Sequence, residues 1–292
     1  MDVTAAVFAD ELLNRGCDDM SFVLEHMRDN LWRGKFSSFS EENCIHGLSG
    51  RLGGVSQKPY ASLNMALHVG DEPEAVWENR QRFLHALGLK AEELVTPEQI
   101  HGINIERVGR TEAGRGAQNY QDSIGQTDAL ITDEPGLPLM LCFADCTPVM
   151  FLDPVNNAVG IAHGGWKGTA ARIAQQTVGR MQAEFGTDPA DLLAGIGPAI
   201  GPCCYEVGSE VADQFRAAFP GHEADLIHDQ AGGTHLNLWE ANRLQLLEAG
   251  LTADHIDMAA TCTACSHQWF YSYRADGGRT GRMAAVIALN KY

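Results

Sequence analysis

The sequence lacks the features that mark membrane, secreted and nucleic-acid-binding proteins. None of its apolar stretches reaches the roughly 20 residues of a membrane span. The first residues, MDVTAAVFADELLNR, have neither the basic start nor the apolar core of a secretory signal. Basic residues are scarce: 21 Lys and Arg face 38 Asp and Glu, a net charge of -17, whereas nucleic acids require a clustered basic face. We therefore expect a cytoplasmic protein with no membrane or nucleic-acid partner.

Familiar phosphate-binding loops are absent as well. Gly195, Gly197 and Gly201 lie in one predicted loop. No Gly-Lys-Ser/Thr closes this loop as in a P-loop, and its spacing is not the G-x-G-x-x-G of a dinucleotide-binding loop. No internal repeat or low-complexity segment is evident. The 292 residues, 45% of them hydrophobic, are enough for a substantial core.

Cysteine, in contrast, is well represented. In a chain of this size without a secretory signal, cysteines favour reduced thiols and metal binding over disulfides. The eight cysteines are Cys17, Cys44, Cys142, Cys146, Cys203, Cys204, Cys262 and Cys265.

The stretch 139–169 organises the chain. It predicts a buried strand, a tight turn that contains Cys146, a second strand, a third strand that ends at His163, and then a helix. A thiol and an imidazole at one edge of a rigid sheet are typical of half a zinc site. The same pair also fits a buried free cysteine and a hydrogen-bonded histidine.

The N-terminal segment differs from the rest of the chain in composition and in its predicted secondary structure. Residues 1–43 are acidic, and two apolar stripes predict two short helices broken near Gly16, followed by a linker at 37–43. We therefore expect a helical N-terminal extension over 1–43 and a single α/β domain over 44–292. The stripes consist of Val3, Val7 and Phe8, and of Phe22, Val23, Met27 and Leu31.

Further elements follow from spacing and turn residues. A helix is predicted to start with Asp71 as its N-cap and to end near Gly88. In LVTPEQIHGINIERV, Gln99 and His101 alternate with Ile100, so both face one side if this segment is a strand. Other helices are predicted over 169–185, about 207–218 and 239–249. Strands are predicted over 127–132 and in two places after residue 255.

Nine short motifs occur in an order that identifies a family. Together they resemble the purine nucleoside phosphorylase family formerly labelled multicopper polyphenol oxidase or laccase-domain proteins, and the resemblance covers about residues 44–292. The motifs are RLGGVS at 51–56, SLN at 62–64, HVGD at 68–71, NR at 79–80, QIHG at 99–102, ADCTPV at 144–149, HGGWKG at 163–168, GPCCYEVG at 201–208 and FYSYRADGGRTGR at 270–282.

The resemblance implies a fold and a metal. The family is similar in fold to a four-layer α/β sandwich around a mixed β-sheet core, so 44–292 would be the catalytic domain with a short helical leader outside it. It also implies one zinc ion per chain, held by His101, Cys146 and His163, which would form the catalytic centre. Three N and S ligands with an open fourth position suit catalytic zinc, with Cys146 as thiolate.

The activity implied is phosphorolysis of adenosine, inosine and guanosine to the free base and ribose 1-phosphate, with adenosine deamination as a side activity. We expect a monomer or small homo-oligomer. An acidic protein must gather cations for phosphate. We favour Arg51 beside its diglycine, helped by Lys167, over Arg274 and Arg282, although each could be a surface or structural charge.

Asn64 and Gln99 are predicted to contact ribose or phosphate. Deamination also needs a proton carrier. The chain lacks the H-x-E and P-C-x-x-C segments of known zinc deaminases, so Glu206 or another acid would serve.

The chain departs from the family pattern H-A-G-W-R-G at Gly164 and Lys167. Lysine keeps the charge but loses the two-pronged contact that arginine makes with phosphate. Glycine at 164 is expected to loosen the backbone beside a ligand.

Three alternatives remain open. A copper-dependent, laccase-like polyphenol oxidase would require a compact blue-copper loop and His-x-His pairs, and none of the eleven histidines forms such a pair. A metal-free hydrolase would use Cys146 and His163 as nucleophile and base, with no need for His101. A non-catalytic binding or regulatory protein with structural zinc could use Cys262-x-x-Cys265, with His267 nearby, as a separate metal clip, but this clip lacks an evident fourth ligand.

Overall fold

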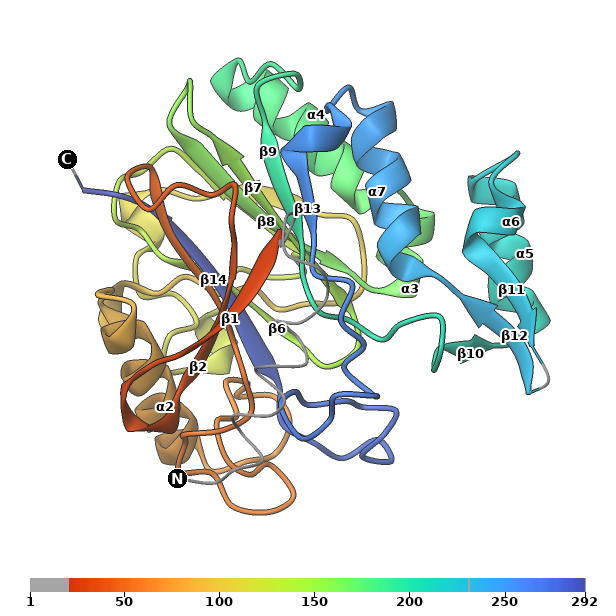
Figure 1. The fold of residues 1–292 in the computed structure, drawn as a ribbon. Helices are drawn as coiled ribbons and strands as arrows, with labels where there is room; N and C mark the ends of the chain where they lie inside the picture. Colours follow the sequence, from red (N-terminus) through yellow and green to blue (C-terminus); the bar gives the residue numbers. More distant parts are fainter. Residues whose placement is uncertain (1–20, 231, 292) are drawn as a thin grey trace.

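A computed structural model describes residues 21–230 and 232–291. Its first sheet is antiparallel throughout, and its strands run in the order β1-β2-β3-β14-β6 (Figure 1). The last strand in sequence therefore lies between β3 and β6. The strands are β1 (Phe22–His26), β2 (Trp32–Phe36), β3 (Cys44–Ser49), β6 (Leu139–Phe143) and β14 (Met283–Leu289).

The second sheet is mixed, with the order β13-β9-β7-β8-β5-β4. Its central pairs are antiparallel, whereas the pairs β13/β9 and β5/β4 at its two edges are parallel. The strands are β4 (Ile105–Arg107), β5 (Ala129–Thr132), β7 (Thr147–Asp153), β8 (Ala158–Gly164), β9 (Leu193–Ile196) and β13 (Ile256–Met258).

Helices cover the outer faces of both sheets. Because side chains alternate along a strand, β6 sends Leu139, Leu141 and Phe143 between the sheets and Met140 and Cys142 toward α2. The second sheet packs its outer face against α4 and α7 in the same way. The four layers are helix, sheet, sheet and helix, which confirms the predicted α/β sandwich. These helices are α2 (Pro73–Ala86), α4 (Ile173–Phe185) and α7 (Leu238–Glu248).

A small lobe projects beside α7 (Figure 1). It holds a three-stranded antiparallel sheet and shares a separate apolar cluster with the start of α7. Its elements are β10 (Glu206–Val207), α5 (Ser209–Ala218), α6 (Glu223–Leu226), β11 (Ile227–Gln230) and β12 (Gly233–Leu236). Elsewhere lie α3 (Trp166–Ala170) and short 3-10 turns at Arg28–Asn30, Ala91–Glu93, Arg110–Glu112, Tyr120–Asp122 and Ala253–His255.

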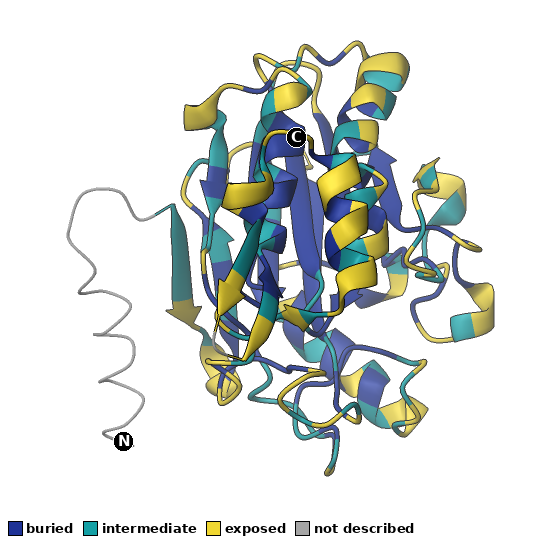
Figure 2. Ribbon diagram, turned by 90° about the vertical axis from the view of Figure 1, so that its right-hand side faces the viewer, coloured by how far each residue is buried: buried dark blue, intermediate teal, exposed yellow. Residues whose placement is uncertain are grey.

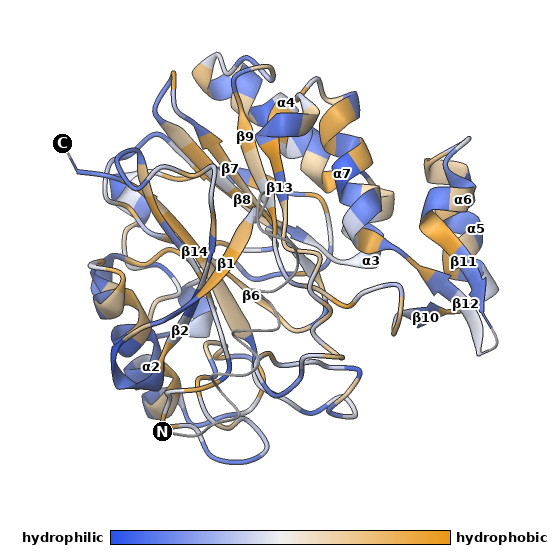
Figure 3. Ribbon diagram, in the orientation of Figure 1, coloured by the Kyte–Doolittle hydropathy of each residue, from blue (hydrophilic) through white to orange (hydrophobic). Residues whose placement is uncertain are grey.

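Burial and hydropathy follow this layering. The strands of the two sheets are largely buried, while helices and loops expose one face (Figure 2). The apolar residues gather on the central strands, and the outer faces of the helices carry the hydrophilic ones (Figure 3). Among the described residues, no helix combines the length and apolar character needed to cross a bilayer.

The helical leader is wrong where the structure describes it. Phe22–His26 pairs with Trp32–Phe36 as an antiparallel hairpin, which joins the first sheet through β3. In β2, the apolar side chains alternate with Arg33 and Lys35, and Phe36 enters the space between the sheets. A short apolar segment fits both a helical and a strand period, and pairing with the sheet decides between them. The first predicted helix lies outside the described residues, and the boundary at residue 43 stays a prediction.

Three further expectations need correction. The N-cap of α2 is Glu72 and not Asp71, which instead accepts hydrogen bonds from Glu72 N–H and from the Asn64 amide. The helix predicted over 169–185 is divided into α3 and α4 at Arg172, which adopts a left-handed φ of 68°. The segment around Gln99 is a loop and not a strand. The predicted strand–turn–strand–strand–helix order of 139–169 is confirmed.

Candidate metal centre

Three side chains that can bind a metal converge at one end of the second sheet. The ligating atoms of His101, Cys146 and His163 all lie within 4.8 Å of one another. Cys146 directly precedes β7 and His163 lies near the end of β8, where the antiparallel register places Pro148 opposite His163. The ladder therefore brings the thiol and one imidazole together, and a loop supplies His101.

Asp128, just before β5, ties these ligands together. Its Oδ1 lies 2.8 Å from His163 Nδ1, and its backbone carbonyl accepts the His163 N–H. The same carboxylate accepts the backbone N–H groups of His101 at 2.9 Å and Gly102 at 2.7 Å. One buried side chain thus orients one imidazole, leaving Nε2 for a metal, and holds the loop that carries the other. Sequence analysis missed Asp128, although it is the second residue of the strand predicted over 127–132.

The loop holds His101 in an uncommon conformation. Its φ is 60°, a left-handed value that few residues other than glycine adopt. Gly165 packs against this loop: a Cβ added there would lie 3.0 Å from His101 Cδ2 and 3.3 Å from Cys146 Sγ. Any side chain at position 165 would therefore collide with the ligands. This close approach explains a glycine in the H-G-G-W segment.

Electrostatics at the centre favour a thiolate. Burial alone would raise the pKa of Cys146, but the positive charge of His163 and hydrogen bonds from His101 and His163 outweigh it and lower the pKa to about 6. Burial lowers the pKa of His163, yet the Cys146 thiolate and the Asp128 carboxylate raise it overall. The centre therefore stabilises negative charge on sulfur and positive charge beside it. A divalent cation meets the same requirement, so the donor set fits a metal.

The convergence of His101 bears on the metal-free alternative. The His101 and His163 rings meet edge to face with centroids 4.7 Å apart. A cysteine–histidine pair acting as nucleophile and base needs one imidazole. A second one within ligand distance of the sulfur favours metal binding over that dyad.

The predicted phosphate residue Arg51 is engaged within the protein. Its Nη1 donates to the His267 carbonyl at 2.6 Å and lies 3.4 Å from Asp276, and its guanidinium lies over the Tyr271 ring. The neighbouring diglycine is also committed, because Gly54 N–H donates to Ser62 Oγ. One of the backbone N–H groups expected to donate to phosphate beside Arg51 therefore already donates within the protein.

Asn64 and Gln99 both hold backbone in place. Asn64 is fully buried, and its amide bonds to Ala66, Asp71 and the N–H of Arg282. Gln99 Nε2 donates to the Cys142 carbonyl at 3.0 Å, and Gln99 Oε1 accepts the Cys142 N–H at 2.8 Å. Their predicted ribose or phosphate contacts stay predictions.

Among the remaining cations, Arg282 is electrostatically coupled to the centre. Burial lowers the pKa of Arg282 overall, although the neighbouring Cys142 and Cys146 oppose this shift. Its guanidinium donates to the backbone carbonyls just before it. Lys167 is exposed and lies over the Trp166 ring, at 5.6 Å from its centroid.

The acid considered for proton transfer, Glu206, is exposed in β10, and its carbonyl accepts from the Arg274 guanidinium. Asp145 lies next to Cys146 in the chain and has a left-handed φ of 86°. Its carboxylate accepts Thr263 Oγ1 and Arg274 N–H, each at 2.7 Å. Asp145 is thus the more closely positioned of the two carboxylates, and sequence analysis did not single it out.

Gly164 does not loosen the backbone as expected. It pairs with Thr147 at the end of β8, and a Cβ there would lie 2.9 Å from the Thr147 carbonyl and 3.1 Å from Asn242 Oδ1. The strand ladder and this tight packing fix the position. An alanine at this position would require both the Thr147 carbonyl and the Asn242 side chain to shift.

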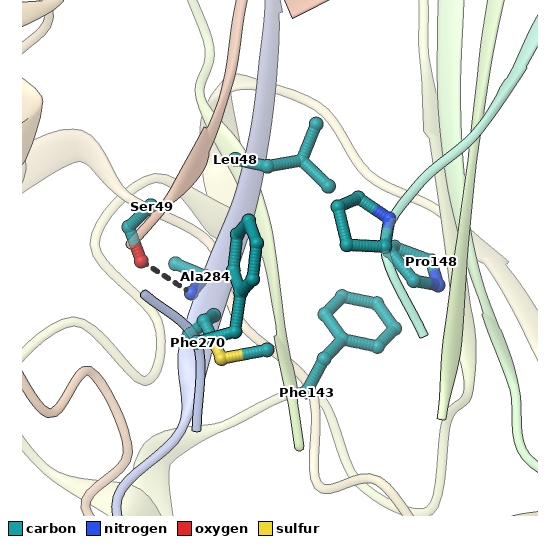
Figure 4. A pocket seen from close by; sticks show the side chains of 8 residues that line it. Leu48, Ser49, Phe143, Pro148, Phe270 and Ala284 are labelled. Atoms are coloured by element: carbon teal, nitrogen blue, oxygen red, sulfur yellow. Dashed lines mark hydrogen bonds between the residues drawn. The ribbon is translucent and has the colours of Figure 1, made fainter. Parts of the chain in front are cut away.

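The gap shown in Figure 4 is lined by none of the three candidate metal ligands, although Phe143, which lines it, packs edge to face against the His163 ring. It lies between the two sheets, is lined mainly by apolar side chains such as Leu48, Phe143 and Phe270, and has a volume of about 10 Å³. A space of this size barely admits one water molecule. It is a packing defect of the core and no binding site.

The layers and the three side chains define an α/β protein with a mixed histidine–cysteine group that could hold a metal ion. The chain belongs to the family described as multi-copper polyphenol oxidoreductase laccase, whose model matches residues 45–290. The family suspected from the sequence motifs is thereby confirmed.

Relatives carry names of a different kind. The purine nucleoside phosphorylase YlmD of Geobacillus stearothermophilus is 44% identical over 245 residues, 84% of this chain and 89% of the relative. The purine nucleoside phosphorylase YfiH of Escherichia coli is 37% identical over 243 residues, 82% of this chain and 92% of the relative. The crystal structure of YlmD from Geobacillus stearothermophilus matches with a TM-score of 0.87 and 41% identity, covering 92% of this chain and all of that one.

Proposed function

We propose that this chain is a zinc-dependent purine nucleoside phosphorylase with adenosine deaminase side activity. The observation that carries the proposal is the convergence of His101, Cys146 and His163, with Asp128 behind them, in a chain whose relatives are named purine nucleoside phosphorylases. In the reaction, the bond from ribose C1′ to the purine breaks, a bond from C1′ to a phosphate oxygen forms, and the leaving base takes up a proton.

The three ligands would hold one zinc ion per chain. Bound there, zinc would supply a Lewis acid and, for deamination, lower the pKa of a water to about 7. Cys146 contributes a thiolate because its pKa is already lowered. Asp128 keeps the His163 ring in one orientation through Nδ1. Mixed sulfur and nitrogen ligation suits zinc, and the long separation of Cys146 from His163 in sequence does not suit a compact blue-copper loop.

The cations have the task of receiving phosphate. Arg51 and Lys167 remain our proposed contacts. Arg51 is held by a salt bridge and by stacking on Tyr271, so its fork is preorganised. For deamination we propose Asp145 as the proton carrier in place of Glu206, since Asp145 directly precedes Cys146 in the chain and two hydrogen bonds hold its carboxylate.

The test is incubation of purified, metal-analysed protein with adenosine, inosine and guanosine, with and without phosphate, followed by chromatography. We expect phosphate-dependent release of free base from each nucleoside and some phosphate-independent conversion of adenosine to inosine. Cys146→Ala should lose the zinc of this site and reduce phosphorolysis at least about a thousandfold, because several kcal/mol of electrostatic stabilisation disappear with the metal.

Cys44→Ala is the matched control, because Cys44 is a cysteine outside the candidate metal centre that lies buried in the core between the sheets. It should keep both metal and turnover. Undiminished phosphorolysis by metal-free Cys146→Ala protein would refute the proposal. Oxidation of phenols by copper-loaded protein, without base release from nucleosides, would favour the polyphenol oxidase alternative.

A further inference from the structure

A second group of potential metal ligands lies outside the centre described above. The sulfur atoms of Cys203, Cys204, Cys262 and Cys265 all lie within 4.8 Å of one another. We call this group the four-cysteine cluster. Its residues come in two pairs, Cys-Cys and Cys-x-x-Cys, about 60 residues apart in sequence. The proposed phosphorolysis gives none of them a role.

The fold brings the two pairs together by a simple route. One pair follows β9 and the other follows β13, and these strands are parallel neighbours. A further parallel bridge joins Ala199 to Cys262 beyond the strand ends. Because parallel strands end at the same edge of a sheet, the loops that follow them leave side by side. The cluster is therefore built on adjacent ends of regular structure.

The sulfur spacing fits metal coordination. Cys203 Sγ and Cys204 Sγ lie 3.6 and 3.4 Å from Cys265 Sγ. Four sulfurs arranged tetrahedrally at about 2.3 Å from zinc are about 3.8 Å apart. A disulfide would instead bring two sulfurs to about 2.05 Å. All four cysteines are free thiols in the structure.

Hydrogen bonds at the most buried sulfur point the same way. Cys262 Sγ accepts the backbone N–H of Gly201 at 3.2 Å and that of Cys265 at 3.5 Å. Donors aimed at sulfur stabilise a thiolate, as the outer partners of metal ligands do. A Cβ at position 201 would lie 2.6 Å from the Trp239 ring, so the close approach of this backbone to Cys262 requires glycine.

The donor set selects the type of metal and its role. Four sulfur ligands with no oxygen or nitrogen favour zinc over magnesium or calcium, and a complete set of four leaves no place for substrate. His267 does not join the group: its Nδ1 lies 3.2 Å from the Ala264 carbonyl. The fourth ligand missing from the Cys262-x-x-Cys265 hypothesis is supplied by the Cys203-Cys204 pair.

We propose that Cys203, Cys204, Cys262 and Cys265 bind a second, structural zinc ion that fastens the two loops beside the catalytic centre. These loops contact residues next to the catalytic ligands. Thr263 Oγ1 donates to Asp145, and the Arg274 guanidinium donates to the Cys204 carbonyl. The ion would thereby stabilise the position of Asp145 without taking part in the reaction.

The experiment is metal analysis of the full chain, purified under reducing conditions without added metal. Zinc, iron and copper are measured by plasma mass spectrometry. We expect two zinc ions per chain in the wild type and one in Cys146→Ala, which retains the cluster. Cys203→Ser/Cys265→Ser should also hold one, and Cys44→Ser should hold two. Cobalt-loaded Cys146→Ala protein should show the intense absorption of a metal bound by four thiolates.

Because the wild type and Cys146→Ala suffice for the count, the test does not depend on folding of the cluster variants. A single zinc in the wild type that is absent from Cys146→Ala would overturn the proposal. So would iron in place of zinc, or a disulfide among the four residues detected by mass spectrometry of protein alkylated without reduction. Lack of phosphorolysis would not alter the count, so the two proposals fail separately.

Discussion

The molecule carries two sulfur-containing clusters that differ in composition and support. At the candidate metal centre, one thiol is combined with two imidazoles, and a buried carboxylate orients them. The four-cysteine cluster consists of thiols alone, two of them exposed, and backbone N–H groups support it. A three-ligand set with mixed donors suits chemistry at an open position, whereas four thiols suit a closed structural site.

The two clusters also differ in the elements that carry them. Cys146 directly precedes β7 and His163 lies in β8, in the middle of the second sheet, whereas the four cysteines follow β9 and β13, the last two strands on one side of that sheet. The hydrogen bond from Thr263 to Asp145 links the two regions. The central strands hold Cys146 and His163, whereas the loops after β9 and β13 hold the four cysteines and contact Asp145.

The strongest test of this contrast removes the carboxylate support from one cluster only. Asp128→Asn should weaken zinc binding at the catalytic centre about 10- to 100-fold, the usual effect of losing an outer-shell partner of a ligating histidine. Competition with a chromogenic chelator measures this change. In the same protein, the affinity of the four-cysteine cluster for zinc should stay unchanged. Equal weakening at both clusters would mean that Asp128 supports the fold generally.

A second test compares thiol reactivity in zinc-free protein. The pKa of Cys146 is lowered to about 6, so its thiolate forms as the pH rises through 6 and is largely present at pH 7. Burial and neighbouring thiols raise the pKa of Cys204 to about 12, so it stays protonated there. Iodoacetamide should therefore modify Cys146 at least about tenfold faster than Cys204 at pH 7. Peptide mass spectrometry between pH 5 and 9 follows both, and half-maximal modification of Cys146 near pH 9 would contradict the described charge arrangement.

The smallest expected effect comes from cutting the link between the regions. Thr263→Val keeps the side-chain shape but removes the hydrogen bond to Asp145. A hydrogen bond to a charged group contributes about 1.5 kcal/mol at the low end of its usual range, which corresponds to roughly tenfold, and Asp145 keeps its hydrogen bond from Arg274 N–H, so kcat for adenosine deamination should fall roughly tenfold or less. Zinc content should stay unchanged at both clusters. Steady-state kinetics beside metal analysis separate this result from loss of metal, and unaltered kcat would remove Asp145 from the mechanism.

The central part of the fold could be predicted because its signals are local and strong. The strands around 139–164 are short apolar runs bounded by turn residues, which are typical of buried strands, and α7 covers Leu238–Glu248, close to the helix predicted over 239–249. The N-terminal hairpin could not be predicted in the same way. The spacing of Val23, Met27 and Leu31 also fits a helix, and only pairing with Trp32–Phe36 reveals the strand.

The sites were predicted unevenly for a physical reason. His101, Cys146 and His163 lie in motifs that identify the family. Asp128 acts through hydrogen bonds to a loop distant in sequence. The Cys203-Cys204 pair became a partner for Cys262 only when the parallel pairing of β9 and β13 was known. Long-range pairing of this kind leaves no periodic trace in a single sequence.

The placement of β14 between β3 and β6 has a consequence for synthesis on the ribosome. Strands made early must wait for this late segment before they share one hydrogen-bonded sheet. Until then, the backbone edges of β3 and β6 that pair with β14 stay unpaired, and a nascent chain with unpaired strand edges is prone to aggregate. A ribosome stalled before Met283 would carry an unfinished sandwich that a holdase chaperone should recognise.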